Sequence, residues 1–122
     1  MSTGLQISMR KSGSATILDL RGRITSGATG DSFRAELLKL AESAPCDVLV
    51  NLAEVTQMDS SGIGALVQSY VILTRGGGSL TILNPTGRVR EVLDVTRLSI
   101  SLPVFTDEAK ALASLHDTAT DA

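Results

Sequence analysis

The first part of the chain alternates hydrophobic and polar side chains as a half-buried strand does. Leu5, Ile7 and Met9 alternate with polar residues, and a second strand-like run follows at residues 15–20. Residues 11–14, Lys-Ser-Gly-Ser, separate the two runs and are typical of a tight turn. The pattern predicts an antiparallel hairpin.

A helix is predicted after a loop that contains glycines 22, 27 and 30, because the apolar residues there recur at helical spacing. Asp31 stands early in this predicted helix and Pro45 closes it. Its apolar positions are Phe33, Leu37, Leu40, Ala41 and Ala44. One buried stripe on a surface helix is expected.

A strand of a different kind spans residues 47–52. Val48, Leu49 and Val50 follow one another, which indicates a parallel strand covered on both faces. A polar block comes next, and then a second helix that ends at Arg75 and the glycines 76–78. The apolar side expected for this helix comprises Ile63, Leu66, Val67, Tyr70 and Val71.

The last third of the chain continues the alternation of strands and helices. A short strand at residues 80–83 precedes a helix that Asn84-Pro85-Thr86 caps, with Val89, Val92, Leu93 and Thr96 facing inward. A last strand is expected from Ile100, Leu102 and Val104, with Pro103 suited to a sheet edge. Residues 106–108 open a final helix with Ala109, Leu112 and Ala113 buried. The sequence therefore predicts one α/β domain over residues 1–116, with a mixed, mostly parallel five-stranded sheet and about four helices, and a frayed tail at 117–122.

Composition and charge narrow the classes of function. The chain has 122 residues and a net charge of -2, so it lacks the basic excess that nucleic-acid binding requires. No apolar run approaches the length of a membrane span, and no signal-like segment opens the chain. Cys46 is the only cysteine, which excludes an intrachain disulfide and a cysteine-based zinc site. We expect a cytoplasmic protein with no membrane or nucleic-acid partner.

Several motifs suggest catalysis or ligand binding but lack their supporting residues. Gly30-Asp31-Ser32 resembles a hydrolase nucleophile block, yet Ala113 stands where an Asp-x-x-His motif ending at His116 needs its acid. Gly62-Ile63-Gly64 lacks the third glycine of a dinucleotide fingerprint, because position 67 is valine. Arg88, Arg90 and Arg97 are more typical of a solvated helix face than of an anion site. We expect neither catalytic residues nor a cofactor or metal site.

The polar block before the second helix is the candidate functional site. Asp59, Ser60 and Ser61 are residue types that cap a helix, and capping alone accounts for part of the pattern. Two consecutive hydroxyls exceed the need of a cap, and Gly62 and Gly64 leave the surface around Ser61 bare at a cost in helix propensity. A phosphate here would meet free N–H groups at the helix start, and it would make a neutral surface acidic without unfolding the domain.

The block Met58-Asp59-Ser60-Ser61-Gly62-Ile63-Gly64, with the aliphatic strand before it, resembles the STAS domains of bacterial anti-sigma factor antagonists. Leu20-Arg21-Gly22-Arg23-Ile24 and Val89-x-x-Val92-Leu93 extend the resemblance over nearly the whole chain. The resemblance implies a non-enzymatic protein that binds an anti-sigma factor and frees a sigma factor.

The resemblance also assigns partners and roles. The anti-sigma factor is implied to be a serine kinase with a histidine-kinase-like ATPase fold. It phosphorylates Ser61, and the phosphorylation abolishes its binding to this chain. A PP2C-type phosphatase is implied to reverse the mark. Met58, Asp59, Ser60, Gly62 and Gly64 are implied to form the partner-binding surface, and Ser60 and Thr56 are alternative acceptors.

One feature departs from the family. Its sporulation members carry an aspartate just after the second strand, where this chain has Thr25-Ser26-Gly27, so the acidic surroundings of the acceptor are reduced. An alternative interpretation stays open: a constitutive interaction or scaffold module, of the stressosome or transporter-associated kind, or a weak nucleotide-binding domain, in which the polar block is chiefly a cap.

Overall fold

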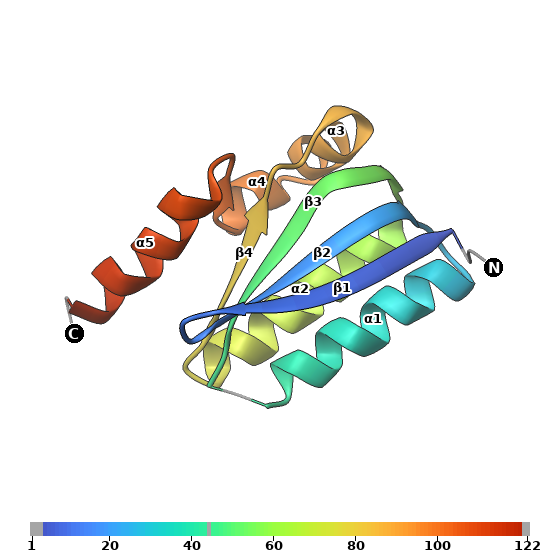
Figure 1. The fold of residues 1–122 in the computed structure, drawn as a ribbon. Coiled ribbons are helices and arrows are strands. Elements are labelled where there is room, and N and C mark those ends of the chain that lie inside the picture. Colours follow the sequence, from blue (N-terminus) through green and yellow to red (C-terminus); the bar gives the residue numbers. More distant parts are fainter. Residues whose placement is uncertain (1–3, 44, 121–122) are drawn as a thin grey trace.

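A computed structural model describes residues 4–43 and 45–120 of the chain (Figure 1). Its elements follow the order β1 (Leu5–Ser12), β2 (Ala15–Ile24), α1 (Ala28–Ala41), β3 (Asp47–Met58), α2 (Ser60–Arg75), β4 (Ser79–Leu83), α3 (Gly87–Val95), α4 (Leu98–Ser101), β5 (Val104–Phe105) and α5 (Glu108–Thr120). The predicted hairpin and the alternation of strands and helices are confirmed.

The five strands form one mixed sheet in the order β1-β2-β3-β4-β5. β1 pairs antiparallel with β2, and every later pairing is parallel, as the sequence predicts. Ile24 at the end of β2 lies opposite Met58 at the end of β3. Because both strands run in the same direction, the loops that follow them meet at one edge of the sheet.

One face of the sheet carries most of the core. α1 and α2 lie side by side across this face (Figure 1). Phe33 and Leu37 of α1 and Leu66 and Leu73 of α2 are fully buried against the strands. The core is aliphatic apart from Phe33, in keeping with an aromatic content of 2%.

The other face of the sheet is only partly covered. α5 packs there through Ala111, which joins a second buried cluster with Ile17, Leu49 and Leu83. Arg10 of β1 fixes the start of α5, because its guanidinium contacts Glu108 at 2.6 Å and Asp19 at 2.6 Å. Both contacts raise the pKa of Arg10, and the hydrogen bond with Glu108 contributes more than the one with Asp19. The hydrogen bond from Arg10 in turn lowers the pKa of Asp19.

α2 is rotated relative to the face that its hydropathy predicts. Gly62, Ala65, Leu66, Ser69 and Leu73 are its buried residues. Val67 and Val71, expected inside, are 40% and 37% exposed. Glycine, alanine and serine add little hydropathy, but their small size lets the helix approach its neighbours closely, so packing selects a face that the apolar pattern does not mark.

The region before β5 differs from the prediction. Residues 98–101 form the short helix α4, and the strand is limited to Val104 and Phe105. Ile100, expected in the strand, is 78% exposed. Arg97 adopts a left-handed conformation, with φ 64°, and this turn starts α4 immediately after α3. A single left-handed residue of this kind is not encoded in the alternating pattern.

β3 and α5 both extend beyond their expected ends. β3 continues through Met58 rather than ending at Leu52. α5 continues through Thr120, past the domain boundary expected at residue 116, while residues 121 and 122 lie outside the described part. No helix among residues 4–43 and 45–120 is both long and apolar enough to cross a bilayer.

Candidate functional site

The polar block lies at the carboxyl edge of the sheet, between β3 and α2. Asp59 is the N-cap of α2 and has an extended backbone, with φ -114° and ψ -167°. Its N–H donates to the carbonyl of Ile24 at 3.1 Å, which continues the pairing of β3 with β2 by one step. The strand pairing therefore fixes the position of the cap.

The carboxylate of Asp59 joins two segments that are far apart in sequence. Oδ1 accepts hydrogen bonds from the N–H of Ser61 at 2.9 Å and from its hydroxyl at 2.6 Å. Oδ2 accepts from the N–H of Ser26, in the loop between β2 and α1, at 2.8 Å. These bonds lower the pKa of Asp59. The bond from the Ser61 hydroxyl has the largest effect, and the bond from the Ser26 N–H comes next. Asp59 is thus an anion at neutral pH with three donors satisfied.

The hydroxyl of Ser61 is confined on a second side by α1. A Cβ atom added to Gly30 would lie 2.6 Å from Ser61 Oγ and 2.5 Å from the carbonyl oxygen of Thr25. Ser61 itself is half-buried, whereas Ser60 beside it is exposed. A phosphoryl group is much larger than a hydroxyl and carries about two negative charges, and this side of Ser61 Oγ lacks room for even one added Cβ on Gly30. On Ser61 it would therefore have to turn away from Gly30 and the Asp59 carboxylate or displace them.

The first turn of α2 has fewer free N–H groups than the sequence suggested. The N–H of Ser61 is bonded to Asp59 Oδ1, and those of Gly62 and Ile63 are bonded to the Asp59 carbonyl at 3.1 and 3.2 Å. The expectation of free N–H groups waiting for a phosphate is therefore wrong at these three positions. A charge on Ser61 would act on its surroundings more than on the helix start.

The two glycines of the block do different things. Gly62 is buried, and an added Cβ would meet Met58 Cγ at 2.7 Å and Ile24 Cγ2 at 2.9 Å. It serves packing and leaves no bare surface, contrary to the expectation from the sequence. Gly64 is exposed, and an added Cβ would meet nothing within 4 Å. Only Gly64 provides the bare surface that was expected of both.

Apart from Arg88, which lines a groove beside Asp59, the other residues singled out in the sequence lie apart from this block or form no site. Ser32 of the hydrolase-like motif is exposed on α1, and the side chain of His116 lies outside the described part. Arg90 pairs with Asp94 within α3 at 3.6 Å. The hydroxyl of Thr56 donates to the carbonyl of Gly22 at 3.2 Å. Cys46 is a free, half-buried thiol.

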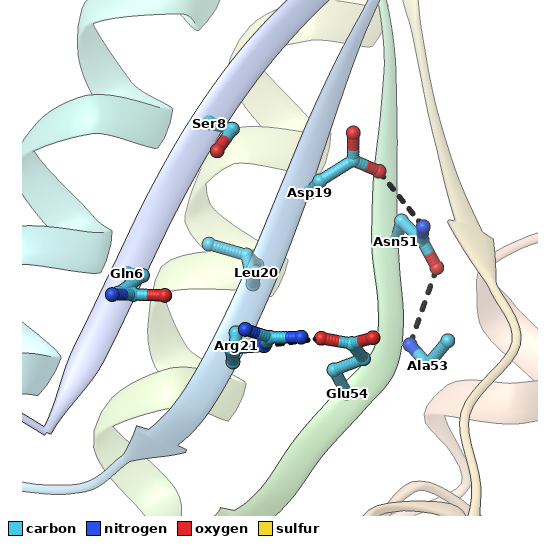
Figure 2. Close-up of a pocket in the computed structure, with 8 residues that line it drawn as sticks. All are labelled: Gln6, Ser8, Asp19, Leu20, Arg21, Asn51, Ala53 and Glu54. Atoms are coloured by element: carbon cyan, nitrogen blue, oxygen red, sulfur yellow. Dashed lines mark hydrogen bonds and ion pairs between the residues drawn. The ribbon is translucent and has the colours of Figure 1, made fainter.

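The structure also contains a polar pocket that the sequence analysis missed (Figure 2). It has a volume of about 340 Å³ and lies on the sheet face opposite α1 and α2. Arg21 and Glu54 form an ion pair across β2 and β3, and Asn51 donates to Asp19 at 2.8 Å. Polar residues at alternate positions of apolar strands were the available signal. The polar groups of the pocket pair with one another, which is typical of a solvated sheet face.

Three comparisons place the chain among known proteins. The STAS domain model matches residues 6–111. The anti-sigma F factor antagonist of Paenibacillus polymyxa is 27% identical over 92% of this chain and 96% of its own length. An anti-sigma factor antagonist from Mycobacterium paratuberculosis has a similar structure, with a TM-score of 0.79 at 18% identity, covering 92% of this chain and 94% of that one.

A further structural neighbour is known in two states. SpoIIAA in its unphosphorylated form matches with a TM-score of 0.78 at 19% identity, over 92% of this chain and 97% of that one. The Bacillus SpoIIAA in the phosphorylated form matches with a TM-score of 0.70 at 19% identity, over 90% and 99%. At these identities the structural matches establish the fold.

Proposed function

Because the chain belongs to the STAS domain family, we propose that it is an anti-sigma factor antagonist regulated by phosphorylation of Ser61. In its unphosphorylated form it binds an anti-sigma factor and so frees a sigma factor. The protein acts by binding and carries out no catalysis itself. The observation that carries the proposal is the position of Ser61: it lies in the first turn of α2, held by Asp59, in a chain similar to antagonists along almost its entire length.

The anti-sigma factor is proposed to be a serine kinase with a histidine-kinase-like ATPase fold, and a PP2C-type phosphatase is proposed to remove the phosphate. Both act on Ser61, and ATP is bound by the kinase rather than by this chain. Since the partners regulate transcription, the exchange takes place in the cytoplasm. The proposed docking surface around the acceptor consists of Met58, Asp59, Ser60, Gly62 and Gly64, where the buried Gly62 contributes through the shape of the loop.

The physical effect of the phosphate follows from the Asp59 carboxylate. Ser61 now donates its hydroxyl proton to Asp59 at 2.6 Å, and a phosphoryl ester has no such proton. About two negative charges would replace the donor beside an existing anion. A partner that fits the neutral surface would then meet an acidic, bulky one, and its affinity would fall.

The test compares Ser61→Ala and Ser61→Asp as baits in a lysate of the source organism, with bound proteins identified by mass spectrometry. We expect an anti-sigma factor with an ATPase domain on the alanine bait and its loss from the aspartate bait. Ser14→Asp is the matched control, because it adds the same charge at an exposed serine in the turn between β1 and β2, at the other end of β2 from the acceptor loop. Equal retention on both Ser61 baits would favour the constitutive scaffold module instead.

A further inference from the structure

The two edges of the sheet differ in how they are protected. At one edge β5 is limited to Val104 and Phe105, and Pro103 precedes it. Short edge strands and proline both prevent a further strand from pairing. At the other edge β1 is 8 residues long, contains no proline and pairs with β2 without a bulge. The β1 edge is therefore the one that can accept another strand.

The backbone of β1 has unpaired groups along this edge. The N–H of Arg23 donates to the carbonyl of Gly4 at 2.8 Å, which fixes the phase of the antiparallel ladder between β1 and β2. Since bonded and non-bonded pairs alternate along such a ladder, the N–H and C=O groups of Ile7, Met9 and Lys11 point away from β2. None of these groups has a hydrogen-bond partner in the part of the chain that the structure describes. A neighbouring strand would satisfy them.

A groove lies beside the same edge, between β1 and α1. It has a volume of about 480 Å³. Its lining residues are Leu5, Ile7, Met9, Ser32, Ala35 and Glu36. Met9 is 48% exposed, although its neighbours on this face of β1 are apolar. Figure 1 shows β1 as the outermost strand on this side of the sheet, with α1 next to it. Both the backbone and the side chains of β1 thus leave the edge incomplete.

β1 is complementary to itself when a second copy pairs antiparallel about a two-fold axis at Ser8. Ile7 of each copy then lies opposite Met9 of the other, and a pair of this kind exchanges both N–H···O bonds. A shift of the axis by one residue in either direction shortens the paired segment. A shift toward the carboxyl end of β1 also brings Arg10 and Lys11 nearer to their own copies, and like charges placed opposite each other destabilise a sheet. Backbone and charge therefore favour the same register.

The side chains on the α1 face agree with this register. Met9 of the second copy, opposite Ile7, comes to lie against the groove beside α1. Lys11 of the second copy projects on the same face, where Glu36 lines the groove. Neither Lys11 nor Glu36 forms an ion pair among the described residues. The pairing brings each of these opposite charges toward a partner from the other copy.

We infer that the β1 edge is an interaction surface for a second copy of this chain, which pairs antiparallel about a two-fold axis at Ser8 and covers the groove beside α1 with Met9. The inference does not rest on the proposed function. Leu5 lies opposite Gly22, near the end of β2 that leads to the acceptor loop, and Ser12 lies opposite Ala15 at the far end. The antiparallel copies therefore direct their acceptor loops away from each other, and both loops stay accessible.

The experiment measures the dissociation constant of the dimer by analytical ultracentrifugation of the full chain, from micromolar to millimolar concentration. Met9→Pro removes an N–H that points outward and leaves the bonds to β2 in place, and Met9→Lys adds a charge at the interface. We expect each to raise the dissociation constant about tenfold or more, because the two-fold axis repeats each loss. Val95→Lys is the matched control, since Val95 is 82% exposed on α3, and it should change the constant less than about twofold. Thermal unfolding of each variant verifies that the fold is intact.

A second arm tests the register with single cysteines in a Cys46→Ser background, incubated with oxidised glutathione. Ser8→Cys places two thiols on the axis, where the Cα atoms of a non-hydrogen-bonded pair lie about 4.5 Å apart, within the range of a disulfide. Gln6→Cys is the control on the same strand and face, because the two copies of residue 6 would lie about 14 Å apart along the strands. We expect a disulfide-linked dimer from Ser8→Cys and little from Gln6→Cys.

Three results would overturn the inference. A chain that stays monomeric at millimolar concentration excludes the second copy and leaves the edge to a strand of another protein. A dimer that Met9→Pro and Met9→Lys do not weaken uses a different surface. Equal cross-linking of Ser8→Cys and Gln6→Cys excludes the axis at Ser8. Ser61→Asp should dimerise as the unaltered chain does, so the outcome for the β1 edge is independent of the outcome for the proposed switch.

Discussion

The hydroxyl of Ser61 donates a 2.6 Å hydrogen bond to Asp59 Oδ1, so the N-cap of α2 holds the proposed phosphate acceptor of the same helix. Oδ2 of the same carboxylate holds Ser26 in the loop before α1. A single side chain therefore connects the helix cap, the acceptor and a neighbouring loop. Chemistry at Ser61 must disturb at least one of these bonds.

The first prediction concerns the charge of Asp59. Hydrogen bonds from Ser61 and Ser26 lower its pKa, so the folded chain prefers the ionised carboxylate more than the unfolded chain does. This stabilisation is fully present above the ordinary aspartate pKa and is lost as the pH falls through the lowered pKa of the folded state. Asp59→Asn should therefore be less stable than the unaltered chain at pH 7, and the difference should narrow below about pH 4.

Urea unfolding of both chains between pH 7 and pH 2.5 measures this difference. Other carboxylates, such as Asp19, titrate equally in the two chains and cancel. Asp59→Ala removes the cap altogether and should cost about 1 kcal/mol at pH 7. A stability gap that stays constant down to pH 2.5 would show that the Asp59 charge does not support the fold.

The second prediction separates stability from docking at Gly64. This glycine lies within α2, is exposed, and has space around an added Cβ. Gly64→Ala should raise the free energy of unfolding by about 0.5–1 kcal/mol through helix propensity, yet weaken binding of the anti-sigma factor if the bare surface is part of the interface. The measurements are a urea titration and an affinity assay on the same preparation.

Gly30→Ala is the contrasting glycine-to-alanine variant, because Gly30 has no room for an added Cβ. Its Cβ would lie 2.5 Å from the Thr25 carbonyl oxygen, which is backbone and does not move aside easily. Overpacking of this kind costs about 1–3 kcal/mol. A Gly64→Ala protein that is more stable and binds the partner unchanged would remove Gly64 from the docking surface.

The hairpin, the alternation of strands and helices, and the site block were predictable from sequence because each depends on local chemistry. Alternation gives β1, the Val48–Val50 run gives β3, and cap residues mark the start of α2 at Asp59. What could not be predicted depends on tertiary contacts. Gly62 packs closely against Met58 and Ile24, and this contact turns Val67 toward solvent. The sequence pattern within the helix does not indicate how close that contact is.

The functional surroundings of Ser61 show the same limit. Its type and its place in the block were evident, but the bond from Ser26 to Asp59 comes from the parallel pairing of β2 with β3. The groove beside α3 was missed for the same reason. Arg88 and Val92 lie some thirty residues from Asp59 in sequence and meet it only at the edge of the sheet.

The third prediction tests the observed rotation of α2. Leu66 is fully buried, so Leu66→Ala should lower the free energy of unfolding by about 2–5 kcal/mol through the cavity that it leaves. The neighbouring Val67 is 40% exposed, and Val67→Ala should cost less than about 1 kcal/mol. Chemical denaturation of both variants decides the matter. Similar losses at the two positions would mean that the helix presents a different face to the core.

The fourth prediction concerns a buried hydroxyl without a bond. Ser69 is fully buried in α2, and its Oγ has no hydrogen-bond partner among the described residues. A buried polar group in this state costs about 1–3 kcal/mol, and alanine also has the higher helix propensity. Ser69→Ala should therefore unfold at a higher urea concentration than the unaltered chain.

Ser79→Ala is the matched control for Ser69→Ala, because the Ser79 hydroxyl donates to Asp47 Oδ1 at 2.7 Å. The same chemical change there removes a bond that is made and should cost about 1 kcal/mol. The two serine-to-alanine variants are thus expected to shift stability in opposite directions. A loss of stability in Ser69→Ala as large as in Ser79→Ala would imply that Ser69 has a partner in solution, such as a bound water, which satisfies its hydroxyl.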